Sequence, residues 1–426
     1  MTTPPRDDQP RAGNALRRMA RTVGPGIITG AADDDPAGIA TYSIAGAQFG
    51  TGLLWLAPLT WPLMAAVQSM CARVGMVTGG GLMAALRQKF SRPVLLIAAI
   101  ALFSANTFNV GADLAGMADA AELLSGVPSG VWVVIFGVAI AWATIELRYQ
   151  TIARVLKWLV LALFAYIIAA FSVGPDWGDV ARATFRPSMP HGSAMWAMIL
   201  AILGTTISPY LFFWQASEEV EEERAMGRSG RERIGATREE ILGRRLDVGV
   251  GTLFCNVTFF FITLTTALTL HQHGITRPET TTEVASALRP IAGSFATQLY
   301  TIGILGAGAL AIPTLGGSAA YAFAELFGWV EGMDERPTRA RGFYGVFALS
   351  IGCAMLLEFS RFGAVRALYL SAIINGLLAP VLLAGILAVA SDRRVMEGQP
   401  SPLLGRITVL VATIAMLGAA VGMVLL

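Results

Sequence analysis

The sequence predicts an all-α membrane protein of about eleven transmembrane helices, and composition and apolar patterning are the observations behind this. Hydrophobic residues make up 54% of the 426 residues, charged residues make up 14%, and the mean hydropathy is +0.60. A soluble domain carries roughly 25% charged residues, because its surface faces water. Apolar runs approaching the roughly 20 residues of a membrane-spanning helix recur along the chain without alternation, which excludes a β-barrel.

Charged or Gly/Pro-rich breaks divide these runs into eleven expected helices. We place them at 23–46, 52–76, 93–120, 130–147, 154–173, 193–217, 246–270, 296–326, 343–360, 364–390 and 404–426.

The distribution of Lys and Arg predicts the orientation of the bundle, because cytoplasmic loops hold the excess of these residues. With the N-terminus inside, 25 of the 31 lie on the inner side and 6 on the outer side. We therefore expect a multi-pass protein of the cell (inner) membrane with its N-terminus cytoplasmic and its C-terminus outside. The highly charged stretch Glu218–Arg245 is expected to be a solvated cytoplasmic loop containing at most a short amphipathic helix. Met1–Arg21 lacks the apolar core of a signal peptide.

Two of the expected helices contain a proline beside polar or small residues at mid-span. The first reads Gly30-Ala-Ala-Asp-Asp-Asp-Pro-Ala-Gly38, and the sixth reads Gly204-Thr-Thr-Ile-Ser-Pro-Tyr210. Proline removes a backbone hydrogen bond and clashes with the preceding turn, so each helix should kink or unwind there. A carboxylate at mid-bilayer costs about 2.5–3.5 kcal/mol on insertion scales, so three in succession suggest a cation site rather than packing.

Broken helices that open two halves of equal helix count are typical of transporters built from inverted repeats. This predicts a LeuT-type bundle with a cytoplasmic tail at 1–22, a first repeat of helices one to five at 23–173, a second repeat of helices six to ten at 193–390, and an added helix at 404–426.

The first helix resembles the signature of the Nramp family of divalent metal transporters. The resemblance rests on Gly24-Pro-Gly26, on Asp35-Pro-Ala-Gly38 and on Gly46-Ala-Gln-Phe-Gly50. The family usually reads Asp-Pro-Gly-Asn at the second motif and Met-Pro-His in the sixth helix. In helix count and inferred topology the resemblance covers essentially the whole chain.

The resemblance implies four metal ligands: Asp35, the position of Gly38, the backbone carbonyl of Thr205, and Ser208. Gly38 has no side chain where the family has asparagine, and Ser208 has a hydroxyl where the family has a thioether. Oxygen ligands suit Mg²⁺ or Mn²⁺, whereas sulfur favours softer ions. The pattern resembles the Nramp-related magnesium transporters, and it implies alternating-access transport of Mg²⁺ with Mn²⁺ tolerated.

Further polar residues are expected as accessory or proton-path groups: Asp33, Asp34, Asp113, Tyr210 and Gln215. Gly116 stands where the family resemblance implies a second acid in the third helix, and the three histidines, His191, His271 and His273, fall in outer loops as polar surface. Intramembrane proton relays use Asp, Glu and His, so we expect transport without proton coupling. The cysteines Cys71, Cys255 and Cys353 are expected to be buried thiols that pack like small apolar residues.

Other functions remain open at this level. A proton-coupled Mn²⁺/Fe²⁺ transporter of the ordinary Nramp type is the nearest alternative, followed by a non-transporting membrane sensor and by a carrier of organic solutes. The sequence carries no P-loop, so neither an enzyme nor an ATP-driven pump is expected. The expected partners are the divalent cation, as substrate rather than cofactor, and the lipid bilayer, with no nucleotide or nucleic acid. The oligomeric state does not follow from the sequence.

Overall fold

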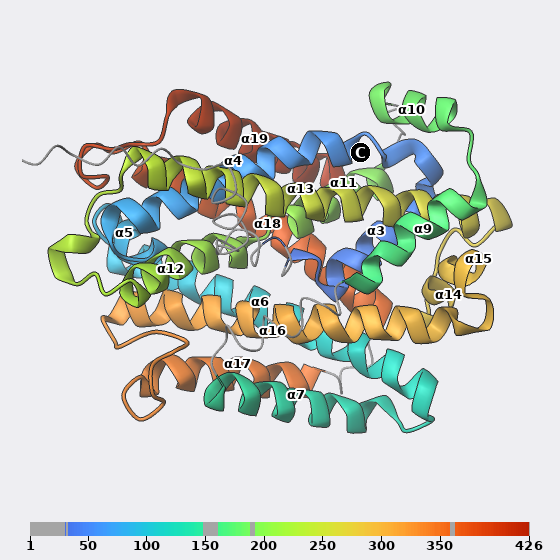
Figure 1. Ribbon diagram of the computed structural model, residues 1–426, viewed down its shortest axis with the longest axis horizontal. Coiled ribbons are helices and arrows are strands. Elements are labelled where there is room, and N and C mark those ends of the chain that lie inside the picture. The colour runs from blue at the N-terminus through green and yellow to red at the C-terminus, as the bar shows by residue number, and fades with distance from the viewer. Residues whose placement is uncertain (1–29, 31–32, 148–160, 188–191, 358–362, 426) are drawn as a thin grey trace, which may run out of the picture.

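The computed structural model describes residues 30, 33–147, 161–187, 192–357 and 363–425, and within these ranges every regular element is a helix (Figure 1). The first half comprises α3 (Pro36–Phe49), η1 (Gly50–Leu53), α4 (Leu56–Thr78), α5 (Leu82–Leu86), α6 (Arg92–Ser125), α7 (Ser129–Glu146), η2 (Leu161–Leu163), α9 (Phe164–Val173) and α10 (Trp177–Phe185). The second half comprises α11 (Ser193–Thr206), α12 (Pro209–Ala225), η3 (Gly230–Arg233), α13 (Arg238–Thr269), η4 (His271–His273), α14 (Thr281–Ala285), η5 (Ser286–Leu288), α15 (Arg289–Ala292), η6 (Gly293–Phe295), α16 (Ala296–Phe327), α17 (Arg341–Leu357), α18 (Ala364–Ala390) and α19 (Leu403–Leu425).

Each of the eleven expected segments contains a helix of the structure. By length and hydropathy, seven stretches of the described residues could span a membrane, and one of these comprises α11 and α12 together. The α3–η1 segment and α4 pass the same test as a pair bent by 113°, and α9 and α17 are shorter apolar helices. Parts of the expected helices lie outside the described residues, namely 23–29, 31–32, 154–160, 358–360 and 426.

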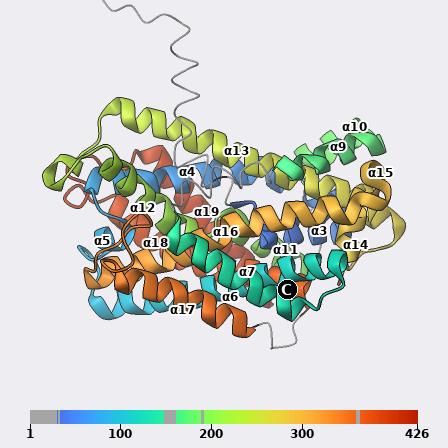
Figure 2. The same ribbon diagram turned by 60° about the horizontal axis from the view of Figure 1, so that its bottom comes forward.

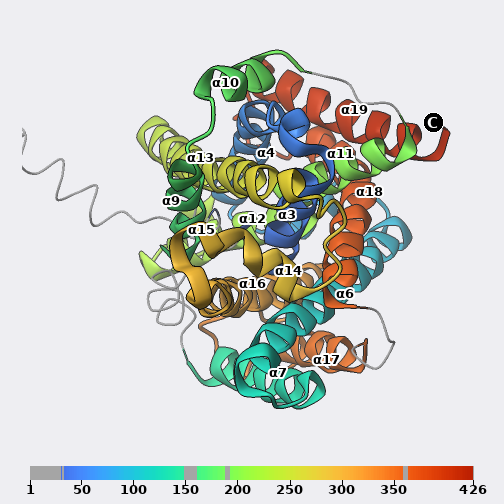
Figure 3. The same ribbon diagram turned by 90° about the vertical axis from the view of Figure 1, so that its right-hand side faces the viewer.

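The long helices run roughly parallel and form a bundle around α3, α11 and α12 (Figures 1 and 3). Viewed along the bundle, α4, α13, α16, α6 and α18 surround this centre, with α7 and α17 outermost on one side and α19 on another (Figure 3). Turning the molecule shows α7 and α17 lying over α6 and α16 (Figure 2), in agreement with the contacts of these helices. The two broken segments are therefore shielded from lipid by the rest of the bundle.

Helices begin at the prolines of the two expected breaks, whereas other prolines lie inside continuous helices. Pro36 is the first residue of α3 and Pro209 the first residue of α12, whereas Pro62, Pro313 and Pro380 lie inside continuous helices. Proline is favoured at the first position of a helix, because the amide it lacks has no intrahelical partner there. Both breaks expected from the sequence are thus confirmed.

Glycines let the broken segments approach their neighbours closely. A Cβ atom at Gly204 of α11 would lie 2.1 Å from the Ala372 carbonyl oxygen of α18, and one at Gly46 of α3 would lie 2.2 Å from the Thr263 carbonyl oxygen of α13. Because no side chain fits at either position, glycine is required for α11 to pack this closely on α18 and for α3 to pack this closely on α13.

The expectation of a solvated loop over Glu218–Arg245 was wrong for both ends of this stretch and holds only for the mostly exposed residues 226–237 between α12 and α13. The residues up to Ala225 continue α12, and α13 begins at Arg238, where a capping box joins Thr237 and Glu240. Acidic and basic side chains in this stretch pair across the two helices, for example Arg244 with Glu219 at 2.7 Å. Pairing allows the charges to be ordered against the bundle, and composition alone does not reveal this pairing.

The histidine pair and the cysteines also differ in part from expectation. His271 is exposed, yet its Nδ1 lies 2.8 Å from the Ala47 carbonyl oxygen, so it links η4 to the end of α3. Cys71 is buried as expected, Cys353 is only partly buried, and the buried Cys255 contacts a carboxylate rather than packing only against apolar atoms.

The predicted orientation can be tested by cysteine labelling. Ser229 lies between α12 and the start of α13, and the exposed His273 lies in η4, just after the opposite end of α13. In a Cys353→Ala background, a membrane-impermeant maleimide added to intact cells should label His273→Cys and leave Ser229→Cys unmodified until the membrane is permeabilised. Labelling of Ser229→Cys in intact cells would reverse the topology.

Candidate metal centre

Asp35 lies at the expected first break, immediately before α3, with only 2% of its surface exposed. It is the N-cap of α3, and its Oδ1 accepts a 2.6 Å hydrogen bond from the Gly38 backbone amide. The free amides and the dipole of a helix N-terminus favour a negative charge, which offsets part of the cost of burying this carboxylate. The structure thus holds one carboxylate in a fixed position at the first break.

The second break places Thr205 and Ser208 at the junction of α11 and α12, where both are buried. The Ser208 hydroxyl donates to the Thr205 carbonyl oxygen at 2.7 Å and to the Gly204 carbonyl oxygen at 3.0 Å. The carbonyl expected as a ligand therefore already accepts one hydrogen bond. The Thr205 hydroxyl oxygen is buried without a hydrogen-bond partner in the described part of the chain. It is a candidate metal ligand that the sequence analysis did not identify.

The two breaks meet at Gly38. A Cβ atom built there would lie 3.1 Å from the Thr205 hydroxyl oxygen and 3.3 Å from Asp35 Oδ1, so both oxygens border the same small space. A side chain at this position would require these oxygens to shift by a few tenths of an ångström. The described residues contain no group of three or more His, Cys, Asp or Glu side chains arranged to hold a metal. The centre is thus one carboxylate with hydroxyl and carbonyl oxygens rather than a cage of charged ligands.

Asn109 of α6 connects Asp35 to Asp113, and sequence reasoning did not identify it. Its amide nitrogen donates to Asp35 Oδ2 at 3.1 Å and to Asp113 Oδ2 at 3.4 Å, and all three side chains are buried. The spacing of four residues between Asn109 and Asp113 places both on one face of a helix. This spacing is the sequence signal that could have identified Asn109. The structure therefore brings Asp113 next to the centre through Asn109.

Asp33 and Asp34 face α13. Cys255 of that helix donates its thiol to Asp33 Oδ2 at 2.8 Å. Neither carboxylate oxygen of Asp34 makes a well-formed hydrogen bond with the described residues, although Cys255 and Thr258 lie nearby. The two residues are buried beside the centre, in a separate environment from that of Asp35.

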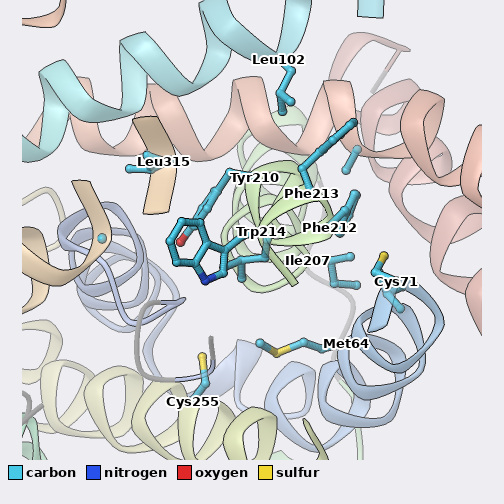
Figure 4. Packing of buried hydrophobic residues seen from close by; sticks show 14 of the residues in the cluster. Met64, Cys71, Leu102, Ile207, Tyr210, Phe212, Phe213, Trp214, Cys255 and Leu315 are labelled. Carbon is cyan, nitrogen blue, oxygen red and sulfur yellow. The ribbon is translucent and has the colours of Figure 1, made fainter. Parts of the chain in front are cut away.

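Tyr210 and Gln215 have different surroundings in α12. Tyr210 is fully buried in the first turn of α12, where its side chain hydrogen-bonds with Asp35, and Figure 4 shows it beside Trp214. Gln215 instead donates to Glu219 at 2.7 Å, and Glu219 pairs with Arg244 of α13. Gln215 thus belongs to the ionic contact between α12 and α13 rather than to the oxygens around Asp35.

Asn109 is expected to position Asp35, and its loss should weaken cation binding by about 10–100-fold, the usual effect of removing a group that orients a metal ligand. Asn106, one turn earlier on α6, is a matched control, because it is equally buried but donates to Leu315 and Ser318 of α16. Calorimetric titration of Asn109→Ala and Asn106→Ala with Mg²⁺ and Mn²⁺ would compare them. Equal losses of affinity in the two variants would assign Asn109 a purely structural role.

The broken helices, the bundle around them and the oxygen-lined centre define a membrane protein of the LeuT-type fold. Comparison with solved structures agrees. A manganese transporter of Eremococcus coleocola superimposes with a TM-score of 0.72 over 96% of this chain and 88% of that chain, at 16% identity. Mhp1, a nucleobase-cation-symport-1 family transporter in a closed conformation, superimposes with a TM-score of 0.59 over 94% and 91% of the two chains, at 14% identity.

The chain belongs to the Nramp family. The family model described as natural resistance-associated macrophage protein-like matches residues 26–426. The divalent metal cation transporter MntH 1 of Pseudomonas aeruginosa is 31% identical over 314 residues, covering 70% of this chain and 68% of that protein. The MntH protein of Brucella suis is 27% identical over 307 residues, covering 69% of this chain but only 64% of its own length. The comparisons agree with a transporter rather than an enzyme. The metal of such a transporter is cargo rather than a resident cofactor.

Proposed function

We propose that the protein is a secondary transporter that carries divalent metal cations, Mg²⁺ with Mn²⁺ tolerated, by alternating access and without proton coupling. The observation that carries this proposal is the position of Asp35, which caps α3 beside the Thr205 hydroxyl, where the two broken helices meet. Family membership and the names of the relatives support divalent metal transport.

The chemistry of the centre favours a hard cation. Its candidate ligands are the Asp35 carboxylate, the Thr205 hydroxyl and carbonyl, and the Ser208 hydroxyl. All are oxygens, and Mg²⁺ is typically bound by one or two carboxylates while it keeps several of its waters. Sulfur at the position of Ser208 would instead favour softer transition ions. A competitive uptake assay in liposomes, with Mg²⁺ against Mn²⁺ and Fe²⁺, tests the preference, and exclusion of Mg²⁺ would favour the ordinary Nramp activity.

The broken helices provide a route for alternating access. Because α11 and α12 join at two non-helical residues, Ile207 and Ser208, α12 can tilt relative to α11 with few backbone hydrogen bonds to break. Unwound backbone at membrane depth is stable only where it is buried or lines a cavity. With the orientation predicted from the arginines, the α12 end of the centre would open to the cytoplasm.

Proton coupling is expected to be absent. Gly116 of α6 lies one turn after Asp113 and packs against Leu368 of α18, so no second acid stands at that position. In liposomes containing a trapped pH-sensitive dye, Mg²⁺ or Mn²⁺ should enter under its own gradient and the membrane potential without a change in dye signal. Protein-free liposomes under the same cation gradient and membrane potential give the reference. Acidification in proportion to the cation taken up would support the proton-coupled alternative.

A further inference from the structure

A groove of about 550 Å³ lies away from the metal centre, between α4, α13 and α19. Figure 1 shows these three helices side by side along one face of the bundle. Most of the groove wall is apolar and comes from exposed or half-buried side chains, including Trp61, Pro62, Ala66, Leu242 and Leu404. This face belongs to the lipid-facing surface of a protein that spans a membrane.

Basic side chains lie at only one end of the groove. Arg73 of α4 and Arg244 and Arg245 of α13 line that end. Arg244 is already paired with Glu219, Glu222 and Asp247. Among the ion pairs that the described residues form, none involves Arg73 or Arg245, and Arg245 is exposed. Arg73 donates its Nε–H to the Gln399 carbonyl oxygen at 3.1 Å, so its terminal nitrogens and the Arg245 guanidinium are the groups available to an anion.

The length of the groove fits one leaflet of a bilayer. Trp61 and Arg73 lie twelve residues apart on the continuous helix α4, a distance of about 18 Å at 1.5 Å per residue. Half of the roughly 30 Å hydrocarbon core is about 15 Å. The Trp61 indole donates to the Gly249 carbonyl oxygen at 3.2 Å, which links α4 to α13 beside the groove. A charged end and an apolar end separated by one leaflet are the dimensions of a phospholipid.

We propose that this groove binds an anionic phospholipid, with an acyl chain along α4, α13 and α19 and the phosphate at Arg73 and Arg245. Charge disfavours the N-terminal segment of the chain as an occupant, because residues 1–29 carry five arginines and two aspartates. Like charges facing each other repel, whereas each arginine near a membrane surface attracts anionic lipid by about fivefold in affinity. The inference concerns lipid binding alone and holds whichever cation the protein transports.

Native mass spectrometry of the purified full-length protein tests the proposal, with phosphatidylglycerol and phosphatidylcholine of identical acyl chains as probes. The wild-type protein should retain one phosphatidylglycerol in preference to phosphatidylcholine. Arg245→Gln should reduce this preference about fivefold, and the double change Arg73→Gln with Arg245→Gln should abolish it. Arg393→Gln removes an exposed arginine elsewhere and should change nothing. Equal retention of both lipids by the wild type, or an unchanged preference in the double variant, would overturn the proposal.

Two further variants separate the apolar groove from other occupants. A Cβ atom at Gly405 of α19 would touch only Pro402, at 3.7 Å, so Gly405→Leu should fold and fill the groove. It should release the bound lipid whatever the headgroup, and full retention would place the lipid elsewhere. A chain lacking residues 1–22 should bind the same single phosphatidylglycerol as the full chain. Lipid binding that appears only after this truncation would identify the tail as the occupant and refute the proposal.

Discussion

Asp35→Ala should abolish saturable uptake of divalent cations and weaken their binding by more than about 100-fold. The change removes the one charged ligand proposed for the centre, so its effect should exceed the 10–100-fold typical of groups that only orient a ligand. It also removes the N-cap of α3, which costs about 1 kcal/mol of stability. Isotope or fluorescent-dye uptake into liposomes, together with calorimetric titration of Mg²⁺ and Mn²⁺, measures both quantities.

Asp35→Asn separates the loss of charge from the loss of the cap. An asparagine oxygen can still accept the hydrogen bond from the Gly38 amide, so α3 should begin at the same residue and thermal stability should stay close to that of the wild type. Uptake should nevertheless be lost, because a neutral amide oxygen is a much poorer ligand for a divalent cation. Saturable uptake at the wild-type level by a well-folded Asp35→Asn protein would show that this carboxylate is not a metal ligand.

The positions of the two breaks could be predicted from sequence because proline acts locally. Pro36 and Pro209 each follow polar or small residues within apolar segments, and in both cases the structure starts a new helix at the proline. Pro62, Pro313 and Pro380 show that proline alone is insufficient, since each lies inside a continuous helix. The polar residues just before Pro36 and Pro209 distinguish these two prolines from the others.

Contacts between helices could not be predicted in the same way. Cys255 looked apolar in sequence, but α13 packs against α3, and this brings the Cys255 thiol to Asp33 just before α3. The charges of α12 and α13 suggested a solvated loop, because only the tertiary fold brings Arg244 to Glu219. Asn109 lies 74 residues from Asp35, so its contact depends on how α6 crosses α3. These residues have ordinary local sequences, and their roles arise from the packing of distant segments.

Ser208→Met should shift selectivity from Mg²⁺ toward Mn²⁺ and especially Cd²⁺. The methionine would add a soft sulfur ligand, and the loss of the hydroxyl would free the Thr205 carbonyl oxygen from its 2.7 Å hydrogen bond. Sulfur is a poor ligand for Mg²⁺, and the longer side chain would displace water that Mg²⁺ keeps. One ligand exchange of this kind changes discrimination by about 1–3 kcal/mol, roughly ten- to a hundredfold. Parallel uptake of Mg²⁺, Mn²⁺ and Cd²⁺ measures the shift.

Ser208→Ala is the matched control, because the structure also supports a purely structural role for this serine. Its hydroxyl donates to two carbonyl oxygens in the last turn of α11, as a side chain that stabilises a helix end would do. The alanine variant frees those carbonyls without supplying sulfur, so Cd²⁺ preference should rise in Ser208→Met and stay unchanged in Ser208→Ala. If both variants keep the wild-type order of cations, the serine only stabilises the break and does not face the ion. If both gain the same preference, the freed Thr205 carbonyl rather than the sulfur determines selectivity.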